Sequence, residues 1–306
     1  MTGNPSRDAG HGGGLLAVGE TMALVAPATG ERLADATDFR VDCGGAESNV
    51  AAHVAALGHP ARWFSRLGDD ALGRRVAGQL SRRGVDVSTV VMDAAHRTGV
   101  YFKDPGSGVL YYRTDSAASH LSPADADVLE FAGIGILHVS GITAAISASA
   151  ASFLDRAIER AHAAGVLVSF DVNDRRALWD AAVAARVLST LARAADLVFV
   201  GRDEAEGLWG TARAEDVRAL FPDVPELVVK DGEVGATAFA GDREVFEPSF
   251  VVPVVDVVGA GDAFAGGYLA AALDGVPHEE RLRAGHRRAA LTLQTTGDFV
   301  DERIGT

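Results

Sequence analysis

The chain has 306 residues, of which 48% are hydrophobic and 23% charged, with a net charge of −14 and an isoelectric point near 5.0. This length and apolar content can build a large core, which excludes a disordered chain, and a single cysteine excludes an internal disulfide. An acidic surface repels phosphate backbones and anionic lipids, so neither nucleic acid nor a membrane is an expected partner. We expect residues 1–13 to form a flexible polar tail. Because no apolar run resembles a signal peptide or a membrane span, the expected location is cytoplasmic.

The first third of the chain alternates short apolar runs with stretches of helical spacing. The apolar runs are bounded by glycine or polar residues, which is typical of buried strands. In the helical stretches apolar residues recur every three or four positions, and a glycine ends each stretch. The predicted strands lie at 15–18, 39–41 and 61–67, and the predicted helices at 46–58 and 72–84.

Residues 98–113 have a different pattern. Two β-rich segments, 98–103 and 109–113, flank the turn sequence DPGSG, which predicts a β-hairpin. No long helical pattern interrupts this part of the chain. We therefore expect the hairpin to belong to a small sheet outside the main series of strands and helices.

The remaining sequence alternates regularly between apolar strands and amphipathic helices. Strands that are apolar throughout and separated by helices indicate a mostly parallel sheet with helices on both faces. Antiparallel strands are expected over 236–254, at one edge. The pattern favours one α/β domain with a small β insert over two independent domains. The predicted strands are 136–140, 166–170, 197–200 and 227–230, and the predicted helices are 149–164, 183–193, 263–273 and 279–295.

The sharpest motif is DVVGAGD at 256–262, a loop of small residues that runs into a predicted helix. Its glycines let backbone N–H groups turn toward one point, and the helix start adds positive potential, so the loop predicts an anion hole. Asp262 suits a role facing an attacking hydroxyl while the amides hold a phosphoryl group. The alternative is that Asp262 is an ordinary helix cap. The P-loop and the dinucleotide fingerprint are both missing from the sequence.

Two signatures resemble those of the ribokinase-like (PfkB) carbohydrate kinase family. GGAESNVA at 44–51, followed by RLGDD and a glycine within 66–73, resembles the N-terminal signature, and 256–262 resembles the C-terminal one. The resemblance covers about 15–300. It implies a ribokinase-like, Rossmann-like three-layer α/β/α sandwich with a mostly parallel central sheet and a small β-sheet lid. The kinase domain is then expected at 14–304, with the lid formed by about 28–43 and 97–115.

Within this family the chain is most similar to the 2-keto-3-deoxygluconate kinases. The similarity rests on Gly19-Glu20, YYR at 111–113, SGIT at 140–143, and the spaced Asp, Asn, Arg, Leu and Trp of 171–179. It implies ATP- and Mg²⁺-dependent phosphorylation of a sugar-acid hydroxyl, with a monovalent cation as a further expected ion. The hairpin tyrosines, 101, 111 and 112, are expected in a lid whose outer face pairs subunits into a homodimer or larger homo-oligomer, or else to pack the small sheet.

The resemblance also implies roles for individual residues. Asp262 would be the general base, with Gly259, Ala260 and Gly261 as the anion hole. Glu204 would act on Mg²⁺ through water, although the asparagine that often precedes it in the family is Gly201 here. The nine histidines show no metal-ligand spacing and are expected to be surface or structural residues. The implied substrate residues are Gly44, Gly45, Asn49, Tyr101, Tyr111, Arg113, Ile142, Arg175 and Asp298. The implied nucleotide residues are Asn173, Lys230, Gly232, Gly235, Gly259, Gly261 and His286.

Two arginines favour an acidic substrate. Arg113 ends the predicted hairpin and Arg175 follows a predicted strand, and guanidinium groups pair well with carboxylates. Family members that act on neutral sugars usually carry an acidic residue just after the first strand, where this chain has TMAL at 21–24. The alternative is that both arginines are surface charges. A kinase of ribose or fructose, a nucleoside kinase, and a catalytically silent sugar-binding family member remain as alternative functions, although the intact 259–262 loop argues against silence.

Overall fold

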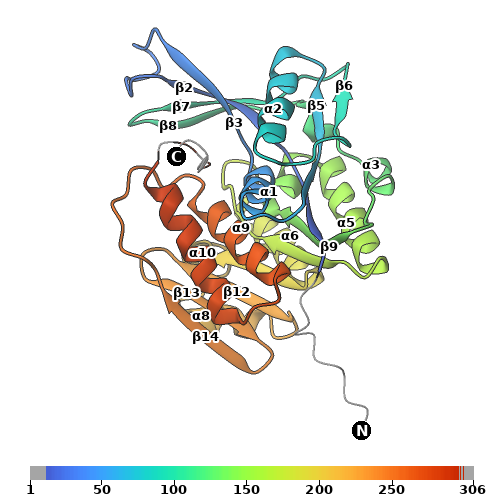
Figure 1. Ribbon diagram of the computed structural model, residues 1–306, viewed down its shortest axis with the longest axis vertical. Helices are drawn as coiled ribbons and strands as arrows, with labels where there is room; N and C mark the ends of the chain where they lie inside the picture. The colour runs from blue at the N-terminus through green and yellow to red at the C-terminus, as the bar shows by residue number, and fades with distance from the viewer. Residues whose placement is uncertain (1–11, 296, 298, 300–306) are drawn as a thin grey trace.

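The computed structural model describes residues 12–295, 297 and 299, and its centre is an eight-stranded sheet (Figure 1). The strand order is β14-β13-β12-β11-β10-β9-β1-β4. All neighbours from β4 to β12 pair in parallel, while β13 and β14 add an antiparallel edge. The strands are β1 (Gly14–Val18), β4 (Ala61–Phe64), β9 (Ile134–Ser140), β10 (Leu167–Asp171), β11 (Leu197–Gly201), β12 (Glu226–Asp231), β13 (Gly235–Ala240) and β14 (Arg243–Pro248).

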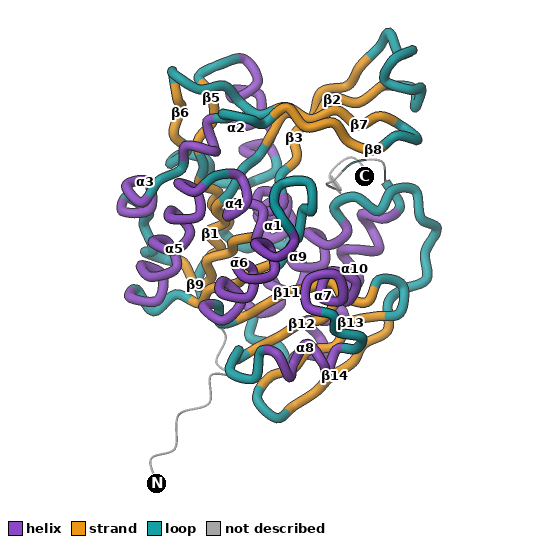
Figure 2. Tube along the Cα trace, turned by 180° about the vertical axis from the view of Figure 1, so that it is seen from behind, coloured by secondary structure: helices purple, strands orange, loops and turns teal. Residues whose placement is uncertain are grey.

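Helices cover both faces of this sheet, because side chains alternate along each strand (Figures 1 and 2). In β1, Leu15 and Ala17 join one hydrophobic core, and Leu16 and Val18 join the other. The first core is closed by α1 (Ala46–Ala56), α2 (Ala71–Arg82), α9 (Ala260–Leu273) and α10 (His278–Leu293). The second core is closed by α3 (Pro123–Asp127), α4 (Gly141–Ile146), α5 (Ala148–Ala163), α6 (Ala181–Ala194), α7 (Arg202–Trp209) and α8 (Ala214–Leu220).

Helix α9 lies in the interior, between α1 and α10. Every residue from 263 to 273 is buried, as expected of a helix that is apolar all round. Two glycines allow this close packing. A Cβ at Gly266 would lie 2.5 Å from His53 Cβ on α1, and one at Gly267 would lie 2.5 Å from the Ala284 carbonyl oxygen on α10. The surrounding helices therefore fix the position of the α9 N-terminus.

A second sheet of four strands, in the order β3-β2-β7-β8, projects from the top of the molecule in Figure 1. The hairpin predicted from the sequence is confirmed as β7 and β8. Strand β2 was not predicted, and it joins the hairpin in parallel and β3 in antiparallel pairing. The four strands of this second sheet are β2 (Met22–Pro27), β3 (Phe39–Gly44), β7 (Val100–Asp104) and β8 (Gly108–Tyr112).

Several predicted elements differ at their ends. The strand expected over 61–67 is split at Ser65 into β4 and β5 (Arg66–Gly68), and β5 pairs instead with β6 (Val91–Asp93). The antiparallel strands expected to reach 254 end at Pro248. Helices α7 and α8 were missed because each buries a single residue, so neither has a clear apolar period.

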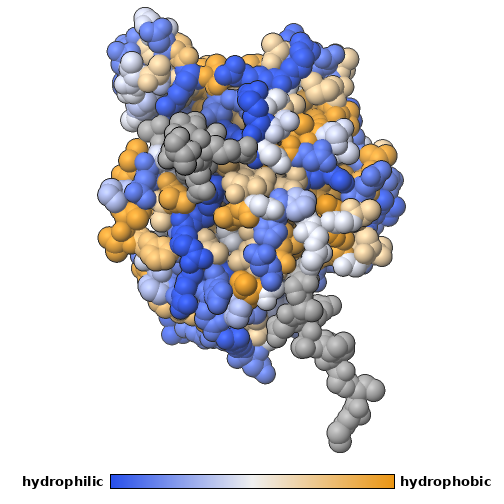
Figure 3. Space-filling view, viewed as in Figure 1, coloured by the Kyte–Doolittle hydropathy of each residue, from blue (hydrophilic) through white to orange (hydrophobic). Residues whose placement is uncertain are grey.

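The surface is mixed in hydropathy on the face that Figure 3 shows, where hydrophilic and hydrophobic residues are interspersed. Within the described part of the chain, none of the helices combines the length and the hydropathy needed to cross a bilayer. Residues 1–11 of the expected tail lie outside the described residues.

Candidate active site

A cavity of about 760 Å³ lies at the carboxyl ends of the parallel strands, the usual place for a ligand in such a sheet. The sheet contributes residues at or just after the ends of β10, β11 and β12. Four helix N-termini, those of α1, α4, α7 and α9, add further residues. The four-stranded sheet supplies the remaining wall through β2, β3, β7 and β8.

Asp262 lies in the first turn of α9, and it is not the helix cap. The cap position belongs to Gly259, whose φ of 83° is in the left-handed region that glycine tolerates, and no side chain caps this helix. Instead, Asp262 Oδ2 accepts a hydrogen bond of 2.9 Å from Asn49 Nδ2 on α1. The first helical turn also leaves backbone N–H groups without intrahelical partners. The carboxyl group therefore faces the cavity beside a cluster of amide donors.

The environment of Asp262 changes its acidity. Burial raises the pKa of Asp262 to about 7, and the negative charge of Asp171 also raises it. The hydrogen bond from Asn49 lowers the pKa, because it stabilises the charged carboxylate. Arg175 and Lys230 oppose the rise. A carboxyl group with a pKa near neutrality can take up or release a proton at neutral pH, which is the property of a general base.

Lys230, at the end of β12, lies between two carboxylates and the loop before α9. Its Nζ lies 2.9 Å and 3.2 Å from the two oxygens of Asp171. Burial acts to lower the pKa of Lys230, but Asp171 and Glu204 together raise it, so the side chain is a cation. A Cβ at Gly261 would lie only 3.7 Å from Lys230 Nζ. This cation therefore adds to the positive potential of the loop.

Glu204 lies in the first turn of α7, and its carboxylate turns back to the backbone. It accepts hydrogen bonds from the amides of Gly201, at 2.8 Å, and Asp174, at 3.0 Å. Burial raises its pKa, opposed by Lys230 and supported by the negative charge of Asp171. Asp171 and Glu204 both line the cavity, which gives the site a pair of carboxylates next to Lys230.

The two arginines singled out in the sequence both line the cavity but differ in their partners. Arg113 forms an ion pair with Glu20, which is itself buried and accepts a hydrogen bond from Ser116 Oγ. Arg175 is exposed, and it makes no ion pair with any described residue. Its guanidinium is therefore available to an acidic ligand.

The structure brings most of the predicted site residues together, and three of the described ones do not line the cavity. Gly235 starts β13, and His286 on α10 bonds through Nε2 to the Glu247 carbonyl oxygen at 3.0 Å and packs against Phe264. Ala260 does not line the cavity, and Asp298 lies outside the described residues. The predicted residues that line the cavity are Gly44, Gly45, Asn49, Tyr101, Tyr111, Arg113, Ile142, Asn173, Arg175, Glu204, Lys230, Gly232, Gly259, Gly261 and Asp262.

Sequence reasoning did not assign a role to several residues that line the cavity. Glu20 lies two residues after β1, and the signal that could have found it is an acidic residue just after the first strand. Asp171 ends a buried strand, which is a recognisable signal for a site residue. Lys103 on β7 forms an ion pair of 3.2 Å with Asp256, in the loop before α9, and no local pattern predicts this contact.

Comparison with known proteins agrees with this architecture. A model of the pfkB family of carbohydrate kinases matches residues 14–302. The 2-dehydro-3-deoxygluconokinase of Bacillus subtilis is 36% identical over 292 residues, covering 92% of this chain and 90% of that protein. The 2-dehydro-3-deoxygalactonokinase of Haloferax volcanii is 35% identical over 299 residues, covering 94% and 92%. The crystal structure of the 2-dehydro-3-deoxygluconokinase from Thermotoga maritima has a TM-score of 0.87 and 27% identity, covering 95% of each chain.

The fold and the site thus define a phosphotransferase that acts on a sugar hydroxyl. The chain belongs to the pfkB family of carbohydrate kinases. The ribokinase-like α/β fold and the family, both expected from the sequence, are confirmed.

Proposed function

We propose that this kinase transfers the γ-phosphoryl group of ATP to a hydroxyl of a 2-keto-3-deoxy sugar acid such as 2-keto-3-deoxygluconate, also called 2-dehydro-3-deoxygluconate. The supporting observation is one cavity that contains the Asp262 carboxyl, the α9 N-terminus and the Arg175 guanidinium. The first two suit phosphoryl transfer to an alcohol, and the third suits a carboxylate on the acceptor. The names of the relatives in Bacillus subtilis and Thermotoga maritima support the same class of substrate.

In this proposal Asp262 is the general base. The acceptor hydroxyl forms the new O–P bond, its proton passes to the Asp262 carboxylate, and the bond between the γ-phosphorus and the ADP oxygen breaks. The hydrogen bond from Asn49 Nδ2 keeps one carboxylate oxygen oriented. The pKa of about 7 makes Asp262 basic enough to accept this proton near neutral pH.

The nucleotide phosphates would be bound at the α9 N-terminus. The amides of the 259–261 loop and the Lys230 ammonium form a positive end of the cavity, which suits a group that carries several negative charges. Asn173 and Gly232, at the same strand ends, also line the cavity. The side chains of Val257 and Val258 provide apolar surface next to this end.

Mg²⁺ fits the chemistry of the residues beside Lys230. Mg²⁺ prefers carboxylate oxygens and bound water, and Asp171 and Glu204 supply two carboxylates that line the cavity. These residues would hold the ion through water. The ion would supply charge shielding for the phosphates, while Lys230 and the loop amides position the transferred group.

The acidic end of the substrate would be bound by arginine. Arg175 has no ion pair within the described structure, so a substrate carboxylate would provide its partner, while a neutral sugar would leave it in solvent. Arg113 is already balanced by Glu20, so it adds hydrogen-bond donors rather than a free charge.

We also propose that the four-stranded sheet acts as a lid that excludes water from the transferred group, and that its outer face pairs two subunits of a cytoplasmic homodimer. Leu110 and Tyr112 on β8 face away from the cavity and are 46% and 65% exposed, which is apolar surface that a partner subunit could cover. Light scattering of the purified protein and of Tyr112→Asp tests this assembly. A wild-type monomer at micromolar concentration would contradict it.

The experiment that tests the proposed reaction is a kinase assay on a panel of substrates, in which the release of ADP is measured. The panel contains 2-keto-3-deoxygluconate, its galactonate epimer, ribose and fructose, with Mg²⁺ present or chelated and with potassium or sodium as the salt. We expect efficient turnover of a sugar acid and a dependence on Mg²⁺. Asp262→Asn should keep the fold and lower turnover by about 10²–10⁴. Higher kcat/KM for ribose or fructose than for either acid would refute the substrate class.

A further inference from the structure

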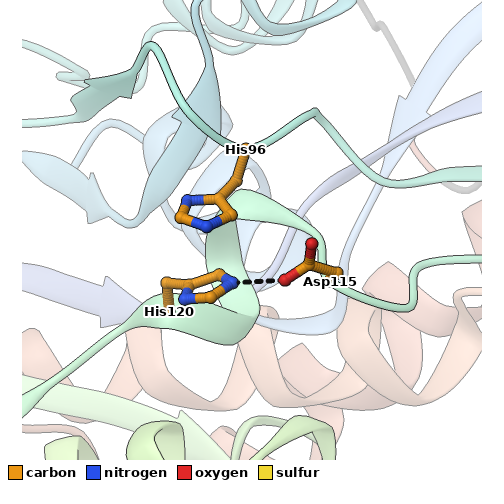
Figure 4. Close-up of side chains that lie close together, drawn as sticks. All are labelled: His96, Asp115 and His120. Atoms are coloured by element: carbon orange, nitrogen blue, oxygen red, sulfur yellow. Dashed lines mark hydrogen bonds and ion pairs between the residues drawn. The ribbon is translucent and has the colours of Figure 1, made fainter.

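The side chains of two histidines and an aspartate, His96, Asp115 and His120, lie close together and are at least partly exposed (Figure 4). His96 follows β6, Asp115 follows β8, and His120 ends the 3₁₀ helix η1 (Ala117–His120). One nitrogen or oxygen of each side chain lies within 4.8 Å of the others. The two imidazole rings stack with centroids 3.5 Å apart, and His120 Nε2 lies 2.6 Å from Asp115 Oδ1.

We propose that His96, Asp115 and His120 form a binding site for a divalent transition-metal ion, with Zn²⁺ as the best match. Two imidazoles and one carboxylate are the ligands that Zn²⁺ takes in three-residue protein sites with an open fourth position. A site for Mg²⁺ or Ca²⁺ would instead be built from oxygen ligands alone.

The three side chains must rotate to close around an ion, although their ligand atoms already lie within 4.8 Å of one another. Zn–N and Zn–O bonds of about 2.0–2.2 Å place ligand atoms roughly 3.4 Å apart in a tetrahedral site. The stacked rings must tilt away from each other, because each nitrogen donates its lone pair in the plane of its own ring. The side chains of His96, His120 and Asp115 are 27%, 39% and 73% exposed, so they have room for this rotation.

A carboxylate behind His96 already selects the ring nitrogen that would bind the metal. His96 Nδ1 lies 3.1 Å from Asp93 Oδ2, and that oxygen also accepts a hydrogen bond of 2.8 Å from Arg66 Nη2. A carboxylate paired with arginine can only accept, so Nδ1 carries the proton and the Nε2 lone pair is left for a metal. Metal-binding histidines commonly have such a carboxylate on the opposite nitrogen, where it fixes the ring and raises its basicity.

The backbone beneath the cluster is held in place without a metal. Arg97 and Ser116 form a parallel bridge, and the Ala117 amide donates to the Arg97 carbonyl oxygen at 2.8 Å. The segment that carries His96 is therefore joined to the segment that carries Asp115 and His120. Little chain ordering would accompany metal binding, which favours affinity.

The site also adjoins the turn that carries Arg113. Ser116, next to Asp115, donates from its hydroxyl to Glu20 Oε1, and Glu20 is the ion-pair partner of Arg113. A metal on Asp115 would hold this turn in the arrangement seen in the structure. We therefore expect slower amide hydrogen exchange over 113–120 in the metal-bound protein.

The test is a calorimetric titration with Zn²⁺. It uses the full-length, tag-free protein after treatment with EDTA, in the absence of ATP and sugar. We expect one saturable Zn²⁺ site in the micromolar range at neutral pH, and about a tenfold or greater loss of affinity in His120→Ala and in Asp115→Asn. The control is His162→Ala, because His162 is also an exposed histidine paired with a carboxylate, Asp196, but lies on α5. This variant should bind Zn²⁺ like the wild type.

Absorption by bound Co²⁺ gives a second readout that reports directly on the ligands. Visible Co²⁺ bands should appear with the wild type and with His162→Ala, and they should be absent with His120→Ala. If His120→Ala is unfolded, His96→Ala is measured in its place. No saturable binding by the wild type overturns the proposal, and so does unchanged binding by folded variants of the cluster. Because these measurements need neither substrate, their failure would leave the proposed kinase reaction intact.

Discussion

Asn49 and Asp262 join the first turns of α1 and α9 through a hydrogen bond of 2.9 Å from the amide Nδ2 to the carboxylate Oδ2. The other atom of this amide, Oδ1, is buried and accepts no hydrogen bond from the described protein. Asn49 therefore contacts the proposed base through Nδ2 alone. The hydrogen bond also opposes the effect of burial on the Asp262 pKa, so it influences the pH range in which the enzyme works.

We expect kcat/KM to rise with pH through about 7, because the proposed base must be ionised and the pKa of Asp262 is about 7. In Asn49→Ala the pKa should rise further, since a donor to the charged form is lost, and the acidic limb should move to higher pH. A pH profile of kcat/KM for the two proteins checks this. The position of the limb is decisive, because loss of a substrate contact alone would lower the whole profile without moving it.

The same pKa predicts a dependence of stability on pH. A carboxyl whose pKa is raised in the folded state stabilises it at acid pH, and this contribution is lost as pH rises from about 4 through about 7. Asp262→Asn removes the ionisation. We expect the variant to gain unfolding free energy relative to the wild type at alkaline pH but not at acid pH, as measured by urea denaturation without ligands. An equal difference at both pH values would contradict the prediction.

The sequence predicts best what is local to it. The buried strands and amphipathic helices are visible because each carries its own apolar period, and the 256–262 loop is visible because its glycines are adjacent to a helix start. Strand β2 was missed although it is largely buried, because its partners are β3 and β7 rather than a neighbouring βα unit.

Contacts between distant residues explain what the sequence could not show in the site. The pairs Asn49–Asp262, Arg113–Glu20 and Lys230–Asp171 are each brought together by the fold, and no periodicity links their positions. Residues 20–24, just after β1, show how such a distant contact affects the interpretation of the sequence. Residues 21–24 carry no acidic side chain, while Glu20, one position earlier, lines the cavity and forms an ion pair with Arg113.

Substitution of Arg175 should distinguish acidic from neutral substrates. In Arg175→Ala we expect KM for the sugar acid to rise about tenfold or more, since a charge-assisted hydrogen bond contributes about 1.5–3 kcal/mol, while KM for a neutral sugar changes little. Arg176→Ala is the matched control, because Arg176 is exposed and does not line the cavity. Steady-state kinetics on both substrates check this, and parallel changes in the two KM values would count against the assignment.

The ion pair between Arg113 and Glu20 should behave as a buried pair. Glu20 is 2% exposed, so Arg113→Met leaves a buried carboxylate without its cation, at a cost of about 3–5 kcal/mol in unfolding free energy. Adding Glu20→Gln removes that charge, and the double variant should recover most of the loss. Denaturation of the single and double variants measures the coupling. A double variant as unstable as the sum of the two single variants would show that the pair is not coupled.

The packing of α9 predicts opposite effects for two glycine substitutions inside helices. Gly266→Ala would place a Cβ 2.5 Å from His53 Cβ, so α1 and α9 must move apart, with an expected loss of about 1–3 kcal/mol in stability. Because the two helices carry Asn49 and Asp262, the same movement should lengthen their hydrogen bond and lower kcat.

Gly78→Ala is the control for this substitution. At Gly78 in α2 the new Cβ would meet only a flexible arginine nitrogen at 3.5 Å, so the higher helix propensity of alanine should stabilise the protein by about 0.8–1.0 kcal/mol. Thermal unfolding and kcat of the two variants give the comparison. A Gly266→Ala protein with wild-type kcat and stability would show that the position of the base does not depend on the close contact between α1 and α9.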